Sequence, residues 1–212
     1  MRFELVGWPA DGPKLALDYR AFSYAGKFVM SNTGKAVALA GANEGSPAGA
    51  GAAGAAGGDA SERPPPATDI DGVVDPDGRI LGAVAFNADR TDPKTWWLRY
   101  ITVRGDRRGE GVGPRLAAFT SARLRERRAE RVRIAVNNPY AYEALYCAGF
   151  AYTGEETGIA EHVLACPPPD RSRATYRAGL DVFRARGPDP DERSFLDRKA
   201  GRDPPAVVDP QE

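Results

Sequence analysis

The chain has 212 residues, 42% of them hydrophobic, so it is long enough to bury a sound core in one domain with appendages. Its 29 basic residues balance its 29 acidic residues, which excludes a strong overall field that would favour nucleic acid or membrane surfaces. Two cysteines, Cys147 and Cys166, are too few for a disulfide framework and have no metal-site spacing. The N-terminus has no apolar signal core and no run approaches membrane-spanning length, so we expect a soluble, cytoplasmic protein.

The first predicted elements are a strand, a helix and a second strand. Arg2–Val6 alternates between apolar and polar residues, as an edge strand does. Leu17–Phe28 has apolar residues at helical spacing, although Gly26 costs such a helix about 1 kcal/mol relative to alanine. Lys35–Leu39 then predicts a strand, after a helix stop at Gly34.

Residues 40–68 differ from their surroundings because Ala, Gly, Ser and Pro dominate them. Such a segment cannot bury enough apolar surface to offset the entropy of ordering, so we expect a disordered insertion. It lies inside one domain, because strand patterns continue at Ile70–Val74 and Arg79–Phe86.

A strand, a glycine-rich turn and a helix follow one another over residues 96–115. The apolar run Trp96–Val103 predicts a buried strand, and helical sequence runs from near Pro114 to about Arg128. The turn between them contains Gly109, Gly111 and Gly113. Glycine permits a tight turn and close approach of a ligand, while the first N–H groups of a helix are unpaired and point at an anion. The arrangement predicts a phosphate-binding site.

Two well-known phosphate motifs do not fit this turn. A P-loop ends in Gly-Lys-Ser/Thr, whereas Gly113 is followed by Pro114 and Arg115. The dinucleotide fingerprint G-x-G-x-x-G fails because the glycines fall two apart and Pro114 occupies the third required position. A glycine-rich helix entry without any ligand is the alternative interpretation.

The second half of this helix is rich in arginine, which raises the question of nucleic acid. Glu126 and Glu130 are interleaved with the arginines, and no aromatic residues alternate with them. Cations at a helix C-terminus also complement the helix dipole. We therefore expect a solvated helix face and no nucleic-acid partner.

The remaining elements complete the first domain and add a second unit. Arg131–Val136 predicts a strand, and Asn138 and Pro139 start a short helix as its cap and first residue. Phe150–Thr153 and Ile159–Cys166 predict a hairpin. We expect a first domain over residues 1–166, a helical extension over 167–200 and a disordered tail over 201–212. The first extension helix covers either the sheet or a partner subunit, so a homodimer remains open.

Two motifs resemble the GNAT superfamily of N-acetyltransferases. The first is Arg108-x-x-Gly111-x-Gly113 after a strand, which is similar to the acetyl-CoA pyrophosphate loop of that family. The second is similar to the family's Asn-x-x-Ala followed by Tyr-x-x-Gly-Phe, and its residues here are Asn138, Ala141, Tyr146, Gly149 and Phe150. One departure is that Tyr146 follows Asn138 by eight positions, where the family usually has seven.

The resemblance implies a fold and a cofactor site. The fold class is α/β (α+β), the GNAT acyl-CoA N-acyltransferase fold, with a mixed, mostly antiparallel central sheet flanked by helices. The strand ending at Val103 is implied to splay from Arg131–Val136, so that pantetheine pairs with the exposed strand backbone. Asn138 either contacts pantetheine or only caps its helix. The residues implied to bind acetyl-CoA are Thr102, Val103, Arg108, Gly109, Gly111, Val112, Gly113, Pro114 and Asn138.

The resemblance also implies transfer of an acetyl group from acetyl-CoA to a primary amine of a small molecule or a protein, without a metal. Tyr146 is implied to protonate the departing thiolate; the alternative is a half-buried aromatic residue. Cys147 is interpreted as a packed thiol. The general base is open among Tyr100, Glu161, His162 and water, and the acceptor pocket is expected near Tyr24, Ser31, Asn32 and Glu155. A non-catalytic acyl-CoA-binding module is the alternative function, because Trp96–Val103 contains no carboxylate.

Overall fold

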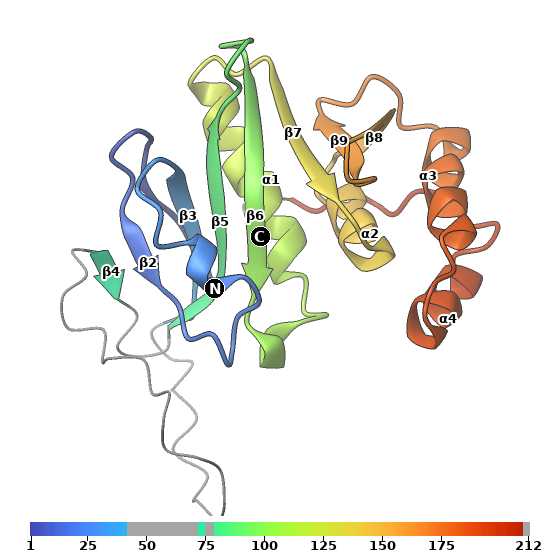
Figure 1. Cartoon of the computed structure of the whole chain (residues 1–212), viewed down its shortest axis with the longest axis horizontal. Helices are drawn as coiled ribbons and strands as arrows, with labels where there is room; N and C mark the ends of the chain where they lie inside the picture. Colours follow the sequence, from blue (N-terminus) through green and yellow to red (C-terminus); the bar gives the residue numbers. More distant parts are fainter. Residues whose placement is uncertain (42–71, 75–78, 210–212) are drawn as a thin grey trace, which may run out of the picture.

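The centre of the molecule is a seven-stranded sheet, and the computed structural model describes residues 1–41, 72–74 and 79–209 (Figure 1). The strand order is β1-β3-β5-β6-β7-β9-β8. The contact between β6 and β7 is parallel, and the other neighbours in this sheet are antiparallel. This confirms the predicted fold class. The strands are β1 (Arg2–Gly7), β3 (Gly34–Leu39), β5 (Ile80–Ala88), β6 (Thr95–Val103), β7 (Arg131–Val136), β8 (Ala151–Glu156) and β9 (His162–Cys166).

A second, two-stranded sheet pairs β2 (Lys14–Ala16) with β4 (Gly72–Val74) in parallel. The predicted insertion over residues 40–68 lies outside the described residues from position 42 onward. The described segments on its two sides meet, since the Ala40 N–H donates to the Arg79 carbonyl at 2.8 Å.

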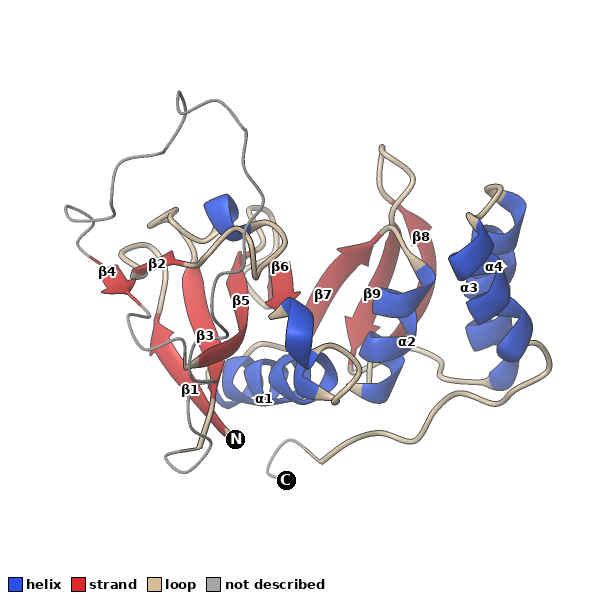
Figure 2. Cartoon of the chain, turned by 90° about the horizontal axis from the view of Figure 1, so that it is seen from below, coloured by secondary structure: helices blue, strands red, loops and turns tan. Residues whose placement is uncertain are grey.

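The helices form layers around the large sheet (Figure 2). Helices α1 (Val112–Glu126) and α2 (Pro139–Cys147) lie on one face, and the segment that holds the 3₁₀ helix η1 (Ala25–Lys27) lies on the other. Helices α3 (Arg173–Ala185) and α4 (Pro190–Arg198) lie beyond β8, at the edge of the sheet. Since α3 packs against β8 of its own chain, part of its apolar face is covered by the sheet edge.

The core is divided by the sheet into two clusters. Val84 and Phe86 of β5 face the α1 side, whereas Ala83 and Ala85 face the η1 side. Successive side chains of a strand point to opposite faces, so a strand covered on both faces is apolar throughout. This accounts for the continuous apolar run of β5.

The predicted helix over Leu17–Phe28 is wrong. The structure has turns there, and η1 is the one short helical piece in this segment. Tyr24 has a left-handed backbone (φ 61°), which interrupts a helix directly before η1 begins at Ala25. The apolar spacing arises because Phe22 and Phe28 pack into the second cluster.

Other predicted boundaries differ by a few residues. Helix α1 begins at Val112, two residues before Pro114. Asn138 caps α2 as predicted, its side-chain oxygen accepting from the Ala141 N–H at 2.8 Å. The predicted hairpin is present, although β9 begins at His162 rather than at Ile159.

Residues 202–209, which the sequence predicts as part of a disordered tail, return to the C-terminal end of α2. The Val208 N–H donates to the Cys147 carbonyl at 2.8 Å. Arg171 donates to the Tyr146 carbonyl at 2.9 Å and to the Pro205 carbonyl at 2.5 Å. The bond from Val208 satisfies a carbonyl of the last turn of α2, where carbonyls lack intrahelical partners.

Candidate active site

Strands β6 and β7 diverge halfway along their length. They pair from Thr95 with Arg131 to Leu98 with Ile134, and the register ends there. Beyond this point β6 continues against β5 as far as Val103, and β7 continues against β9. Figure 1 shows the two strands separating like the arms of a V. The edge of β6 that faces β7 after Leu98 therefore has no strand partner among the described residues, as the resemblance implied.

Thr102 and Val103, two of the predicted acetyl-CoA residues, lie on this free part of β6. Thr102 is 5% exposed, and its hydroxyl oxygen is buried without a hydrogen-bond partner among the described residues. Buried polar atoms are normally paired, so an unpaired one beside an open strand edge fits a site that a ligand completes.

The glycine-rich turn leads from β6 into α1. After the 3₁₀ helix η2 (Gly105–Arg107), Gly109 and Gly111 adopt φ values of +83° and +79°, which glycine adopts without steric cost. Gly111 is the N-cap of α1, so the helix has no capping side chain, and no acidic residue stands in its first turn. Its first N–H groups remain available for an anion, and the positive end of the helix dipole adds to their effect.

The arginines of this turn differ in their partners. Arg107 forms an ion pair with Glu110 at 2.8 Å, so its charge is compensated locally. Arg108 donates to the Ser23 hydroxyl at 2.8 Å. Because this hydroxyl is neutral, the contact does not compensate the positive charge of Arg108. The same contact ties the turn to the segment on the η1 face of the sheet.

Tyr146, the predicted general acid, lies in the core. Its side chain is fully buried, and its hydroxyl oxygen accepts from the Tyr152 N–H at 3.1 Å and from the Tyr142 hydroxyl at 3.3 Å. Burial raises the pKa of the Tyr146 phenol. Tyr152 belongs to β8 and Tyr142 to α2. The Tyr146 ring also packs against the Tyr176 ring of α3, with 4.8 Å between the ring centroids.

The spacing of the second motif bears on the direction in which the Tyr146 side chain points from α2. Consecutive residues of an α-helix are turned by about 100° around its axis. Asn138 fixes the start of α2, and Tyr146 is the eighth residue after it. The Tyr146 side chain therefore points about 100° away from the side chain of the seventh residue. That position holds Leu145, which is 2% exposed.

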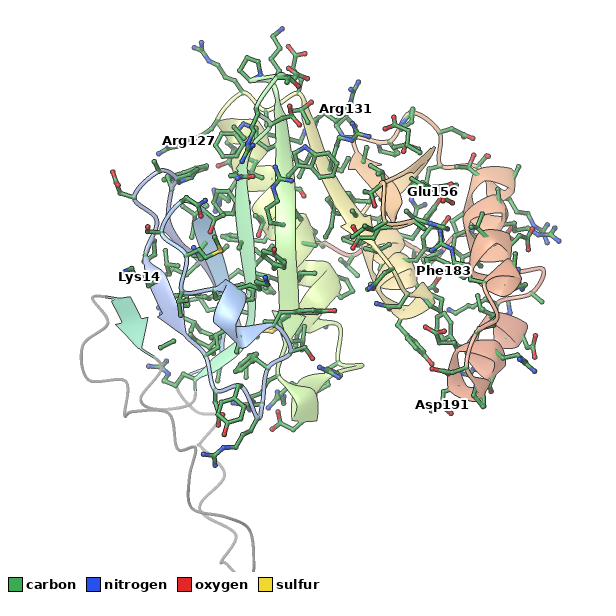
Figure 3. All side chains as sticks on the ribbon, in the orientation of Figure 1. Lys14, Arg127, Arg131, Glu156, Phe183 and Asp191 are labelled. Carbon is green, nitrogen blue, oxygen red and sulfur yellow. The ribbon has the colours of Figure 1, made fainter. Side chains whose placement is uncertain are left out.

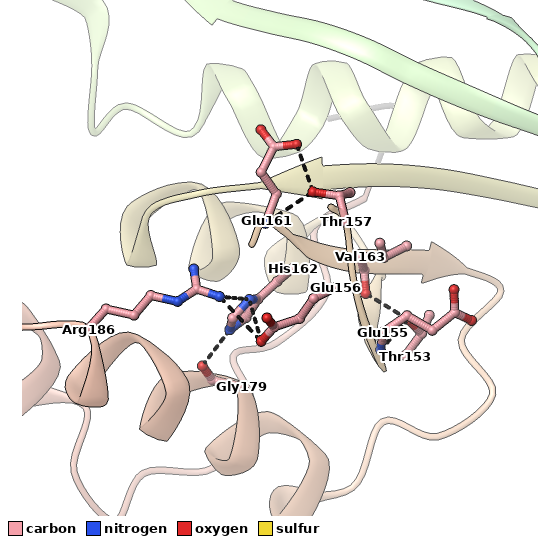
Figure 4. A network of polar contacts seen from close by, with 9 residues as sticks. All are labelled: Thr153, Glu155, Glu156, Thr157, Glu161, His162, Val163, Gly179 and Arg186. Carbon is pink, nitrogen blue, oxygen red and sulfur yellow. Dashed lines mark hydrogen bonds and ion pairs between the residues drawn. The ribbon is translucent and has the colours of Figure 1, made fainter. Parts of the chain in front are cut away.

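His162 is buried where α3 meets the sheet edge, the region in which Figure 3 labels Glu156 and Phe183. Its Nε2 lies 3.1 Å from the Gly179 carbonyl, and Arg186 donates to its Nδ1 at 3.2 Å (Figure 4). This pattern fits a neutral ring with its proton on Nε2. Burial is the main cause that lowers the pKa of His162. These contacts join α3 to the strands.

A cavity of about 470 Å³ opens on the η1 face of the sheet, next to the point where β6 leaves β7. Asn32, which was expected near the acceptor pocket, and Tyr100, which was a candidate general base, line it. Tyr24 and Ser31 are exposed and outside its lining, and Glu155 pairs with Arg133 instead. Glu161 bonds to Thr157 in the β8–β9 turn. The lining is Met30, Asn32, Thr33, Asn87, Asp89, Arg90, Thr91, Arg99 and Tyr100.

Sequence reasoning missed the polar part of this cavity. Asp89 is held by the Thr91 N–H at 2.8 Å and by the Trp97 indole N–H at 2.7 Å, and such bonds hold the pKa of its carboxyl well below the usual range. The sequence Asp89-x-Thr91-Asp92 is typical of a turn and could have indicated this bond pattern. Nothing in the sequence indicates that Arg99 faces the same cavity.

The described part of the chain holds no group of three or more His, Cys, Asp or Glu side chains placed to bind a metal ion. None of its helices has the length and apolar character needed to cross a membrane.

The fold and the site define a mixed α/β protein in which a sheet opens beside a glycine-capped helix start. Residues 59–150 match the family model described as Acetyltransferase (GNAT) family, which is less than half of the chain. This match confirms the resemblance to the GNAT superfamily over that segment. No curated protein matches the chain.

Solved structures of acetyltransferases also match parts of the chain. Nourseothricin acetyltransferase is 25% identical with a TM-score of 0.38, over 43% of this chain and 61% of that one. The paiA N-acetyltransferase from Thermoplasma acidophilum, solved with coenzyme A, is 13% identical with a TM-score of 0.35, over 42% and 54%. An N-acetyltransferase from Staphylococcus aureus Mu50 is 19% identical with a TM-score of 0.35, over 42% and 59%. The match therefore spans less than two thirds of each of these structures.

Proposed function

We propose that the protein transfers an acetyl group from acetyl-CoA to a primary amine by direct attack. The observation that carries the proposal is the position of the free edge of β6, which leads directly into the uncapped start of α1. Pantetheine is an extended chain with amide groups, so it can pair with an exposed strand edge as a further strand would. Diphosphate suits the N–H groups at the helix start.

The residues that would hold acetyl-CoA come from one continuous stretch, except Asn138. Thr102 and Val103 offer strand backbone, and the N–H groups from Gly109 to Gly113 offer donors for the diphosphate. Arg108 adds a positive charge. Asn138 uses its side-chain oxygen to cap α2, and its side-chain nitrogen donates to the Asn137 side-chain oxygen at 3.2 Å, so a pantetheine contact would use the second N–H of this nitrogen.

In the proposed reaction the nitrogen of the neutral amine attacks the thioester carbonyl, the new N–C bond forms and the C–S bond breaks. The amine proton goes to a base or to water, and the thiolate takes up a proton. Tyr146 stays the proposed proton donor, and its enclosed hydroxyl makes this the step to test first. Tyr100 lines the cavity and is the base candidate closest in the chain to the free edge of β6.

The experiment has a binding part and an activity part. Acetyl-CoA at 100 times its dissociation constant should raise the free energy of unfolding by about 2.7 kcal/mol. Release of CoA thiol should then follow addition of an amine, with enzyme and acetyl-CoA without an amine as the blank. Failure of acetyl-CoA to stabilise the protein would refute the proposed site.

A second function, a non-catalytic acyl-CoA-binding module, is favoured by one specific observation. No carboxylate stands on β6, and the Tyr146 hydroxyl is enclosed by its neighbours in the core. This function predicts stabilisation by acetyl-CoA without thiol release for any amine. Steady thiol release with one amine would exclude it.

A further inference from the structure

We propose that the acceptor is a small amine that also carries a carboxylate, and that the Arg99 guanidinium binds this carboxylate. The inference rests on the proposed function, because it concerns the second substrate of the same site. It is carried by the position, the orientation and the lack of an ion-pair partner of Arg99.

Arg99 occupies an irregular position in β6. Tyr100 pairs with Ala85 and Leu98 pairs with Phe86, so Arg99 has no partner on β5. A bulge of this kind re-aims a side chain, and here it places Arg99 in the lining of the cavity. Arg99 is also the first residue of β6 after the last pair with β7. The Arg99 backbone therefore lies at the start of the edge proposed for pantetheine.

The guanidinium of Arg99 is held in one orientation by two neutral groups. Its Nε donates to the Asn87 side-chain oxygen at 2.7 Å, and the guanidinium lies over the Trp97 ring at 5.2 Å. Trp97 is fixed in turn by its bond to Asp89. These contacts occupy the Arg99 Nε and one face of the planar guanidinium. The two terminal nitrogens of the guanidinium are therefore left for a ligand.

No carboxylate of the described residues forms an ion pair with Arg99. Asp89 lies in the same cavity, but the Trp97 indole, the Thr91 N–H, the Thr91 hydroxyl and the Asp92 N–H donate to its oxygens. Arg133, on the neighbouring strand, is paired with Glu155. Desolvation lowers the pKa of Arg99, and the charge of the nearby Asp89 carboxylate acts in the opposite direction without forming an ion pair.

A carboxylate fits this arrangement better than a neutral group. Two terminal N–H groups of an arginine match the two oxygens of a carboxylate in a bidentate pair, which is stronger than a bond between neutral groups. A cavity of about 470 Å³ is within the range that small ligands use. The acceptor class is therefore an amino acid or a similar amine with a carboxylate.

The test uses pairs of acceptors that differ only in the carboxylate, namely a panel of free amino acids and the corresponding amino acid amides. Thiol release from acetyl-CoA is measured for both members of each pair. With the unmodified protein we expect kcat/KM to favour an acid over its amide by about 10- to 100-fold, the range of a hydrogen bond to a charged group. Arg99→Gln should remove this preference through a higher KM for acids, and Arg99→Lys should restore part of it. Arg177→Gln, at an exposed position of α3, is the matched control.

The same pairs are titrated by calorimetry in the presence of CoA, so that binding is observed without turnover. Binding that needs the carboxylate and is lost in Arg99→Gln supports the inference, whether or not thiol is released. The absence of thiol release would count against the proposed function, not against this inference. Equal binding of acids and amides, or an equal loss for both in Arg99→Gln, overturns the inference. A preference for amines with a phosphate over those with a carboxylate also overturns it.

Discussion

Leu98 and Ile134 form the last parallel pair before β6 and β7 separate. On one side of this pair the sheet is continuous, and on the other side β6 has a free edge that leads into the start of α1. The bulge at Arg99 follows Leu98 immediately. The residue proposed to bind the acceptor and the strand edge proposed to bind acetyl-CoA therefore both begin at this pair. Substitutions on the two sides should have separable effects.

The first prediction concerns Gly111, which caps α1 with a φ of +79°. Gly111→Ala should lower the free energy of unfolding by about 1–2 kcal/mol, because an L side chain is strained in this conformation. It should also weaken acetyl-CoA binding, since the strain shifts the N–H groups at the helix start. Denaturant unfolding and calorimetry measure the two effects.

Gly158→Ala is the control for this variant. No positive φ is found at Gly158, and a Cβ there would meet nothing within 4 Å. It should leave acetyl-CoA affinity unchanged. If Gly111→Ala binds acetyl-CoA as tightly as this control does, the glycine turn is not the diphosphate site.

The second prediction concerns Tyr146. Tyr146→Phe removes the oxygen that accepts from the buried Tyr152 N–H, so the free energy of unfolding should fall by about 1–3 kcal/mol. If Tyr146 is also the general acid, kcat should fall by about 10²–10⁴-fold. Both quantities are measured at a temperature where the variant stays folded. A kcat within tenfold of the unmodified protein, with the expected stability loss, would leave Tyr146 a core residue only.

The third prediction concerns the pH dependence of stability through Lys35. Its buried ammonium donates to the Met30 carbonyl at 2.7 Å and to the Thr33 carbonyl at 2.8 Å, and burial lowers the pKa of Lys35 to about 8. Between pH 8 and the ordinary pKa of about 10.4 the unfolded chain binds more protons at this residue than the folded chain. Stability therefore rises with pH in this window, by up to about 3 kcal/mol.

The comparison with Lys35→Met isolates this contribution, because all other titrating groups are common to both proteins. Urea unfolding at several pH values from 7 to 10 should show the unmodified protein gaining stability relative to the variant above pH 8. A difference that stays constant across this range would contradict the lowered pKa.

The fourth prediction concerns Gly179 of α3. Alanine in a helix interior normally stabilises by about 1 kcal/mol relative to glycine. Here a Cβ would lie 2.2 Å from the Tyr142 hydroxyl oxygen, and Tyr142 is fully buried. Overpacking of this kind costs about 1–3 kcal/mol, so Gly179→Ala should lower the melting temperature.

Ala178→Gly, at the exposed neighbouring position, is the matched control for α3. It should cost only the propensity difference of about 1 kcal/mol. A higher melting temperature for Gly179→Ala than for the unmodified protein would show that α3 does not pack on Tyr142 as described.

The sequence predicted those features that depend on neighbouring residues. The strand Arg131–Val136 was predicted with its observed bounds, because its alternation is complete within six residues. Asn138 was identified as a cap because capping needs only the residue itself and the next helical turn. The helix over Leu17–Phe28 failed for a different reason. Its apolar spacing comes from packing against a distant part of the sheet, and such packing can imitate helical periodicity.

The site was predicted only in part for a similar reason. The glycine turn is a local pattern, but the direction of Tyr146 depends on the helix phase that Asn138 sets. The bulge at Arg99 depends on how β5 and β6 align, and no residue type in β6 marks it. The cavity residue Asn87 comes from β5 and Asp89 from the loop that follows β5, whereas Arg99 comes from β6, so their meeting could not be predicted from sequence spacing.

The returning segment at the end of the chain has a consequence for α2. The Cys147 carbonyl accepts from the distant Val208 N–H, and the Tyr146 carbonyl accepts from Arg171 in addition to the local Gly149 N–H. The final turn of α2 is thus closed off by groups far away in the chain. Clipping the polypeptide just ahead of Val208 would uncap a helix some 60 positions upstream. Loss of the segment around Val208 would then cause fraying of the last turn of α2, close to Tyr152 of β8.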